Sequence, residues 1–279
     1  MESVDPESFV EVDRSLLQQL VVKLLQRKGM FAAEAEIVAD RMIDADLERH
    51  PRHGVGSLPE YLEAMDLGDI DPRARVITIN ETAAIAVLDG STGMGHVATT
   101  KAMLMAVEKG LAVGIGSVVI RNSRPCGDLG CVARLAANRG LVGMVTTSFH
   151  DAADIQTHEN SVAWALPANG DAPPVIERTG QRDSLATLGQ ILSAGLAGAD
   201  PLPRKRKANR AANLVEYSLT AISPERFGSA DNFFSKWKSL WQAGPSGSTG
   251  QTVTTVPVTA AVTQQLSELA TKIKFAFNI

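Results

Sequence analysis

The sequence predicts an α/β protein whose mixed sheet carries helices on its faces, preceded by an N-terminal helical segment. Two observations lead to this fold class. Up to about residue 74, apolar residues recur at the three- and four-residue spacing of amphipathic helices. From residue 75 onward, short apolar or alternating runs, which are typical of strands, take turns with helical patterns. The same change divides the chain into a helical segment (1–74), an α/β core domain (75–242) and a linker with a C-terminal strand and helix (243–279).

Three helices are expected in the N-terminal segment. Apolar residues between Leu16 and Leu25 follow helical spacing, and Gly29 is placed to end that helix. A second amphipathic pattern runs up to Glu48. The third helix is expected to begin at Ser57, because residues 57–60 (SLPE) have the form of a capping box with proline in the first turn. Gly68 is expected to end it.

The core domain is expected to alternate strands and helices. Expected strands are residues 75–80, 83–88, 115–120, 141–147, 162–166, 175–176 and 215–222, the first two forming a hairpin. Expected helices are residues 96–113, 128–139, 184–199 and 224–241. Residues 243–251 (AGPSGSTGQ) have the composition of a flexible linker, followed by a strand at 252–258 and a helix at 262–275.

Composition excludes several classes of function. The chain has 279 residues and a formal net charge of −4, which favours neither nucleic acid nor an anionic membrane as a partner. The basic run at 204–207 is interpreted as a solvated surface. No stretch approaches the ~20 apolar residues that span a bilayer, and the acidic N-terminus does not resemble a signal peptide. Two cysteines make no disulfide framework and predict no metal site. We expect a cytoplasmic protein that acts on a small molecule.

Two segments, one in the helical segment and one early in the core domain, carry candidate chemistry. Residues 50–54 (HPRHG) place Arg52 and His53 ahead of the third helix, where they are suited to bind or protonate an anion, although an exposed loop is the simpler interpretation. Residues 89–96 (DGSTGMGH) join a strand to a helix. Their G-x-x-G-x-G spacing differs from the dinucleotide fingerprint, and tight strand-to-helix packing explains it as well as a phosphate site does.

Two further segments follow strand ends. Ligands of open α/β sheets gather at the carboxyl ends of strands, so residues 121–128 (RNSRPCGD) are the first place to expect a site. Asn122, Ser123 and Arg124 offer donors for a carboxylate, and Cys126 and Asp128 are the groups there that can transfer protons. Residues 146–151 (TTSFHD) include His150 next to an aspartate, for which a polar loop is the simpler interpretation.

These motifs, in this order and spacing, resemble the malate/L-lactate dehydrogenase-like family of NAD(P)-dependent oxidoreductases. The resemblance is carried by HGVGSLPEYLEAMDLGDIDPRARV from His53, DGSTGMGH from Asp89 and VVIRNSRPCGDLG from Val118. It corresponds to the family patterns S-H-G-V-x-R-L-P, D-G-x-x-G-x-G and R-N-S-x-H-F-G. It implies a non-Rossmann fold, a homodimer, and hydride exchange between NAD(P)H and a small 2-hydroxy, 2-oxo or cyclic imino acid. In that chemistry an arginine holds the carboxylate and a histidine moves the proton.

The chain departs from the family pattern where that chemistry is carried out. The histidine of R-N-S-x-H-F-G falls at Pro125, and the arginine that follows H-G-V falls at Ser57. The family's cofactor segment D-M-A-T corresponds to residues 177–179 (ERT), and K-G-x-G-L-A corresponds to residues 182–186 (RDSLA). The C-terminal L-P-G-E corresponds to residues 256–259 (VPVT), and several dozen family residues are missing between Thr179 and Arg182.

Three hypotheses follow from this combination. The first is an enzyme redirected to non-redox chemistry, such as isomerisation, cyclisation or elimination, on a small anionic or carbonyl substrate. The second is a working NAD(P)H-dependent reductase, and the third is a non-catalytic binding protein. The candidate catalytic residues are His53, Cys126 and Asp128. The candidate substrate-binding residues are Arg52, Ser57, Asn122, Ser123, Arg124 and His150. If NAD(P)H binds, its candidate contacts are Thr147, Ser148 and Glu177.

Overall fold

The computed structural model describes residues 8–150, 161–167, 174–179, 214–223 and 253–277. The chain divides into two compact units, which are described separately below. The first unit comprises residues 1–73 and 250–279, and the second comprises residues 74–249. The helices expected at 184–199 and 224–241, and the linker expected at 243–251, lie outside the described residues.

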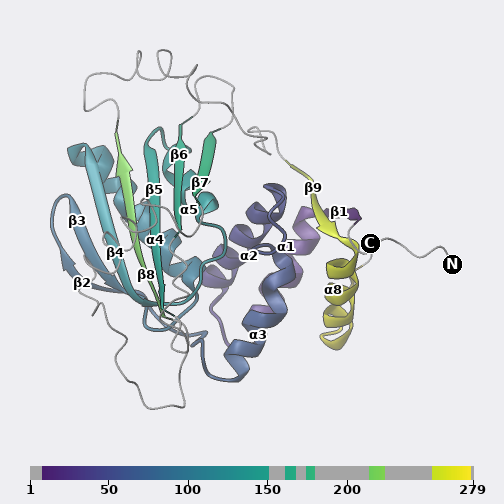
Figure 1. The fold of residues 1–279 in the computed structure, drawn as a ribbon. Coiled ribbons are helices and arrows are strands. Elements are labelled where there is room, and N and C mark those ends of the chain that lie inside the picture. Colours follow the sequence, from purple (N-terminus) through teal and green to yellow (C-terminus); the bar gives the residue numbers. More distant parts are fainter. Residues whose placement is uncertain (1–7, 151–160, 168–173, 180–213, 224–252, 278–279) are drawn as a thin grey trace. The chain divides into compact units, whose positions relative to one another are not determined.

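The first unit combines helices with a two-stranded antiparallel sheet (Figure 1). Its elements are β1 (Phe9–Asp13), α1 (Arg14–Arg27), α2 (Ala32–Leu47), the short 3₁₀ helix η1 (Val55–Ser57), α3 (Leu58–Asp66), β9 (Thr255–Thr259) and α8 (Ala260–Lys272). The three N-terminal helices and the C-terminal strand and helix are therefore confirmed. Strand β1 was not expected, and it pairs with β9, so both ends of the described chain belong to one unit.

Helix α1 forms for the reasons that its sequence suggests. Its apolar positions are buried, and the Asp13 side chain caps its first turn by accepting a hydrogen bond of 2.8 Å from the Leu16 amide. Gly29 follows the helix with a φ of +95°, a left-handed conformation that favours glycine. Helices α1 and α2 then pack together through their buried faces.

The second unit is built on a seven-stranded mixed sheet with the order β2-β3-β4-β8-β5-β6-β7. Only β3 and β4 are parallel among the described pairs. The strands are β2 (Ile77–Glu81), β3 (Ile85–Asp89), β4 (Ile115–Ser123), β5 (Val142–His150), β6 (Val162–Leu166), β7 (Val175–Thr179) and β8 (Leu214–Ile222). The expected mixed sheet and the expected hairpin of the first two strands are confirmed.

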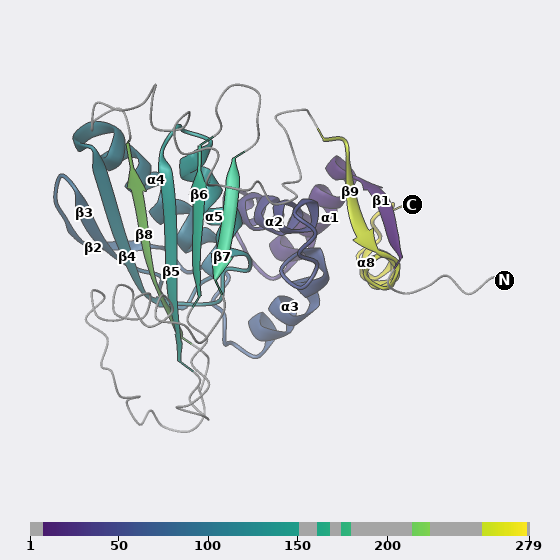
Figure 2. The same ribbon diagram turned by 45° about the horizontal axis from the view of Figure 1, so that its top comes forward.

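Helices α4 (Gly95–Val113) and α5 (Leu129–Ala137) contact each other and cover one face of this sheet (Figure 2). The core between these helices and the sheet is made largely of small and branched side chains, which let the helices approach the sheet closely. At Gly116, for example, an added Cβ would overlap the carbonyl oxygen of Ala106 on α4. Tyr217 is the largest side chain in this core and is 1% exposed. No helix in the described ranges is long and apolar enough to cross a membrane.

Candidate functional site

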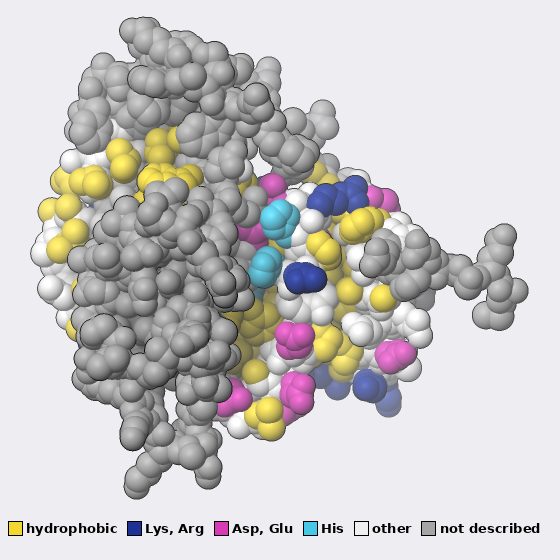
Figure 3. Space-filling view, viewed as in Figure 1, with side chains coloured by type: hydrophobic (Ala, Val, Ile, Leu, Met, Phe, Trp, Pro, Cys, Tyr) yellow, Lys and Arg dark blue, Asp and Glu magenta, His cyan; other side chains and the backbone are white. Residues whose placement is uncertain are grey.

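The turn between α2 and α3, residues 50–57, carries the candidate residues of the first unit. Arg52 and His53 are exposed, and Ser57 is half-buried. Figure 3 shows histidine side chains at the described surface, with a lysine or arginine side chain close by. The turn is shaped by its own backbone, because the amide of His53 donates to the carbonyl of His50 and the amide of Gly54 donates to that of Pro51. An exposed imidazole and an exposed guanidinium on consecutive residues are suited to proton transfer and to anion binding, respectively.

The prediction of a capping box at the start of α3 is wrong. Ser57 has helical backbone angles and makes no side-chain cap. Its hydroxyl instead donates a hydrogen bond of 2.7 Å back to the Gly54 carbonyl, because the chain is already coiled as the 3₁₀ helix η1 before α3 begins. The Ser57 side chain therefore stabilises the turn that carries His53.

Asp46 lies on α2 and contacts this turn. It is not among the candidate residues predicted from the sequence. Its side chain is 2% exposed and accepts a hydrogen bond of 2.8 Å from the Val55 amide. Burial raises the pKa of this carboxyl to about 7, an effect that the Val55 hydrogen bond partly opposes. One signal could have revealed it: Asp46 follows Met42 by four residues, so it falls on the apolar face of its helix.

In the second unit, the first amides of the glycine-containing loop after β3 form hydrogen bonds within the protein. The amides of Gly90 and Thr92 donate hydrogen bonds of 2.8 Å to the carbonyls of Arg121 and Asn122. The Ser91 amide donates to the Asp89 carboxylate, and the Gly93 amide donates to the Gly90 carbonyl. Four consecutive amides, those of residues 90–93, are thus used within the protein.

Side chains at the ends of the parallel strands β3 and β4 bind one another. Asp89 and Arg121 are register partners, and the Arg121 guanidinium lies 3.3 Å from the Asp89 carboxylate. The same carboxylate oxygen accepts a 2.7 Å hydrogen bond from the Asn122 side-chain amide. Asn122, Ser91 and Thr92 all have φ between +51° and +58°, a costly conformation for residues other than glycine. Asn122 therefore fixes this strained junction.

The loop from β4 to α5, residues 124–128, is largely buried. Ser123, which precedes it, is fully buried, and Arg124 is 7% exposed. The Arg124 carbonyl accepts a 2.8 Å hydrogen bond from the Tyr217 hydroxyl. A Cβ at Gly95 would overlap that same carbonyl, so the start of α4 lies directly on the loop. The strand alternation places Tyr217 inward, but its role at this loop depends on contacts far apart in sequence.

Cys126 and Asp128 have structural roles in this loop. The Cys126 side chain lies in the hydrophobic core, and burial raises the pKa of its thiol to about 12. Asp128 is the N-cap of α5, and its carboxylate accepts a 2.6 Å hydrogen bond from the Gly130 amide. A thiol with so high a pKa is a poor proton donor near neutral pH, and the Asp128 carboxylate is engaged as a helix cap. Both cysteines are free.

The remaining candidates lie along β5 and β7. Thr147 lies opposite Tyr217 of β8, whose side chain faces the helices. Ser148 follows it in the strand and therefore points to the opposite face of the sheet. These two side chains do not face a common ligand. His150 ends β5, and Glu177 pairs with Trp164 of β6. The side chains of His150 and Glu177 lie outside the described residues.

Thr147 and Ser148, two of the candidate contacts of a nicotinamide dinucleotide, therefore do not face one site, and the Glu177 side chain lies outside the described residues. The loop amides after β3 are already bonded, and Thr147 and Ser148 point in opposite directions. Within the described ranges, no group of three or more histidine, cysteine or carboxylate side chains is arranged to hold a metal ion.

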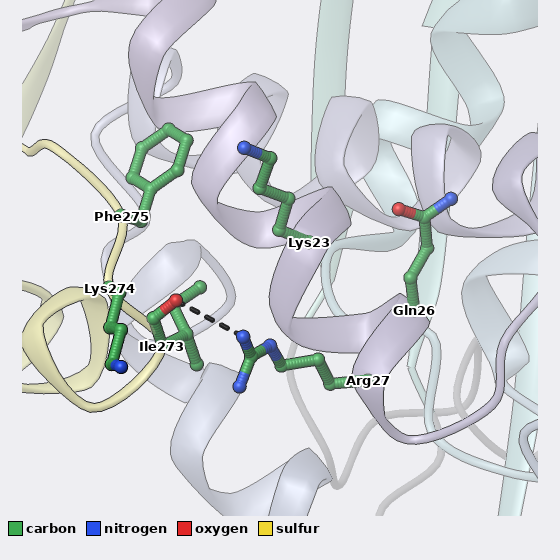
Figure 4. Close-up of a pocket in the computed structure, with 6 residues that line it drawn as sticks. All are labelled: Lys23, Gln26, Arg27, Ile273, Lys274 and Phe275. Carbon is green, nitrogen blue, oxygen red and sulfur yellow. Dashed lines mark hydrogen bonds between the residues drawn. The ribbon is translucent and has the colours of Figure 1, made fainter.

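A groove of about 350 Å³ lies in the first unit between α1 and the segment that follows α8. Its lining residues are Lys23, Gln26, Arg27, Ile273, Lys274 and Phe275 (Figure 4). The Lys23 ammonium lies 4.5 Å from the centre of the Phe275 ring, and Arg27 donates a 3.1 Å hydrogen bond to the Ile273 carbonyl. These two cations hold the C-terminal segment against α1, and no residue predicted from the sequence lines the groove.

Comparisons with known proteins agree with the fold and the motifs. A family model described as malate/L-lactate dehydrogenase matches residues 12–176. L-sulfolactate dehydrogenase of Methanocaldococcus jannaschii is 37% identical over 131 residues, which are 47% of this chain and 38% of that protein. Malate dehydrogenase of Pyrococcus abyssi is 38% identical over 142 residues, which are 51% of this chain and 39% of that protein. The chain thus spans less than half the length of these relatives.

A solved structure extends the likeness to the whole fold. The structure of malate dehydrogenase from Pyrococcus horikoshii superposes with a TM-score of 0.79, covering 100% of this chain and 99% of that one. Sequence identity over this superposition is 20%, so the likeness concerns the fold alone.

Proposed function

The chain belongs to the malate/L-lactate dehydrogenase family, and we propose that it catalyses non-redox acid–base chemistry on a small anionic or carbonyl substrate. The family comprises dehydrogenases and reductases of hydroxy and oxo acids. The proposal keeps that class of substrate and changes the reaction. His53 is the proton-transfer group in it, and Arg52 lies beside it in sequence as the anion-binding group.

One observation carries this proposal: the state of the loop between β4 and α5. The family's proton-transfer histidine corresponds to Pro125, which has no group to donate or accept a side-chain proton. The two neighbours that are chemically suited to replace it are engaged elsewhere, Cys126 in the core and Asp128 as a helix cap. His53, in contrast, is exposed on its turn. The capacity for proton transfer therefore remains at His53.

The reaction class to test first is proton exchange at the carbon next to a carbonyl. A base at His53 would remove that proton and form an enol or enolate, which is the common first step of isomerisation, cyclisation and elimination. In D₂O, the protein should replace the C3 hydrogens of 2-oxo acids such as pyruvate or 2-oxobutyrate with deuterium, faster than buffer does. Proton NMR follows this exchange without any cofactor.

The matched variants are His53→Ala and His50→Ala, which remove neighbouring imidazoles from the same turn. We expect His53→Ala to slow exchange by about 10²-fold or more, and His50→Ala to retain most of the rate. The proposal is wrong if the protein exchanges no member of the panel faster than buffer, or if His53→Ala exchanges as fast as the unmodified protein.

A second candidate function is supported by the relatives, whose names describe dehydrogenases. In this alternative the chain exchanges a hydride between a nicotinamide cofactor and a 2-oxo, 2-hydroxy or cyclic imino acid. Calorimetric titration with NADH and NADPH separates the two: binding at micromolar concentrations supports the reductase, and the absence of binding at millimolar concentrations removes it. If the protein neither binds the cofactor nor exchanges protons, the remaining hypothesis is a non-catalytic binding protein.

A further inference from the structure

Asp46 is a buried acid whose carboxyl contacts the turn that carries His53. It is 2% exposed, and it accepts a 2.8 Å hydrogen bond from the amide of Val55, two residues after His53. Gly54, between them, lies so close that a Cβ there would overlap the Asp46 carboxyl oxygens. Burial of an acidic side chain costs free energy, so we expect Asp46 to perform a function at this position.

The carboxyl joins the turn to a rigid helix. Backbone bonds shape the turn itself, and the His50 amide also donates to the Ala45 carbonyl on α2. The Asp46 contact lies on the other side of His53, at Val55. His53 is thus attached to α2 both before and after its own position. An exposed side chain on a turn fixed at both ends keeps its position better than one on a free loop.

We propose that Asp46 is the positioning residue for His53, and that the charge on its carboxyl sets how firmly the His53 turn is held. This inference rests on the proposed function, because it gives His53 its chemical role. A carboxylate accepts a stronger hydrogen bond from the Val55 amide than a neutral carboxylic acid does. Burial opposes that charge more strongly than the Val55 hydrogen bond favours it, so the turn is held more firmly when Asp46 is protonated.

The surroundings of Asp46 allow that change of charge near neutral pH. Burial raises the pKa of its carboxyl to about 7, and the Val55 bond lowers it in part. Helix α2 contacts α1, η1 and β9, of which η1 and β9 contain no titratable side chain. The charged or titratable groups nearest in sequence or on α1 are Arg14, Lys23, Arg27, Asp44, Glu48, Arg49, His50, Arg52 and His53. The turn should consequently loosen as pH rises through about 7.

The test is an NMR pH titration of the full-length protein, followed at the Val55 amide. The variants are Asp46→Asn, which keeps an oxygen acceptor but does not titrate, and Asp46→Ala, which removes the acceptor. The matched control is Asp40→Asn, because Asp40 lies on the same helix, has its pKa raised by burial, and accepts a hydrogen bond from Gln18 instead.

We expect the Val55 amide signal to titrate near pH 7 in the unmodified protein and in Asp40→Asn, and to stop titrating in Asp46→Asn. Asp46→Ala should speed hydrogen exchange of that amide by roughly tenfold and shift the His53 imidazole signal, with rescue by Asp46→Asn at a fixed pH of 6. An amide that does not titrate in the unmodified protein, or a His53 signal identical in all variants, overturns the inference.

The two proposals fail separately. The Val55 and His53 signals need no substrate, so they judge the positioning role alone. If they behave as expected while His53→Ala keeps full exchange activity, the proposed function is wrong and the positioning stands. If Asp46→Ala does not fold, Asp46→Asn still decides the titration.

Discussion

The hydroxyl of Tyr217 donates a 2.8 Å hydrogen bond to the carbonyl oxygen of Arg124, which lies 93 positions earlier in the chain. This bond joins the middle of the sheet to the loop between β4 and α5. Both groups are buried, so neither can exchange its partner for water. The loop that carries Pro125, Cys126 and Asp128 is therefore held by the core of the second unit.

Removal of that hydroxyl should destabilise the protein. Tyr217→Phe leaves the Arg124 carbonyl without its strongest donor, and we expect the free energy of unfolding to fall by about 1–3 kcal/mol. Urea unfolding followed by circular dichroism measures the change. A variant as stable as the parent protein would mean that water or another donor reaches this carbonyl.

Close packing at the start of α4 predicts a larger effect. A Cβ at Gly95 would overlap the backbone carbonyl of Arg124, which cannot rotate away. We expect Gly95→Ala to cost about 3 kcal/mol in the free energy of unfolding. Gly56→Ala is the control, because its Cβ would meet a methyl of half-buried Val262, 2.8 Å away, which can turn aside. Equal losses for both variants would contradict this packing.

Asp46 predicts a pH dependence of stability with a definite sign. Its pKa is about 7 in the folded protein against 3.8 ordinarily, so the folded state binds more protons between these values. The contribution is fully present below about pH 4 and is lost as pH rises through about 7, by at most about 1.4 kcal/mol per pH unit. Asp46→Asn should remove this part of the slope in urea unfolding measured from pH 4 to 8. An unchanged slope would contradict a buried, titrating Asp46.

Two variants distinguish a structural role of Asp128 from a catalytic role. Asparagine is also a good N-cap, so Asp128→Asn should keep stability near that of the parent, whereas Asp128→Ala should lose about 1 kcal/mol. If Asp128 acts only as a cap, Asp128→Asn also keeps the proton-exchange activity. Loss of that activity at full stability would return Asp128 to the catalytic candidates.

The two cysteines should not react in the folded protein. Both are buried, and the Cys126 thiol has a pKa of about 12, so very little reactive thiolate exists at pH 8. Ellman's reagent should detect close to no thiol in the native protein and two per chain in guanidinium chloride. Rapid labelling of one thiol without denaturant would show that the core around Cys126 opens.

Local sequence patterns predicted most of the elements in the second unit. Strand β6, for instance, has the bounds expected from its apolar run, because alternation and helical spacing record which side of an element is buried. Strand β1 was missed. Its five residues include two acids, and what holds it is register pairing with β9, about 245 residues away. No local pattern reports a pairing over that distance.

The sequence by itself determined the family and the mixed α/β class, because these depend on residue type and order. Only the tertiary structure decided what the candidate residues do. Cys126 lies in the core, Asp128 caps a helix, and Thr147 and Ser148 face opposite sides of the sheet. It also revealed Asp46, whose proximity to the His53 turn arises from the packing of the turn on α2. Proton affinity and access depend on burial and neighbours in space, which residue order alone does not specify.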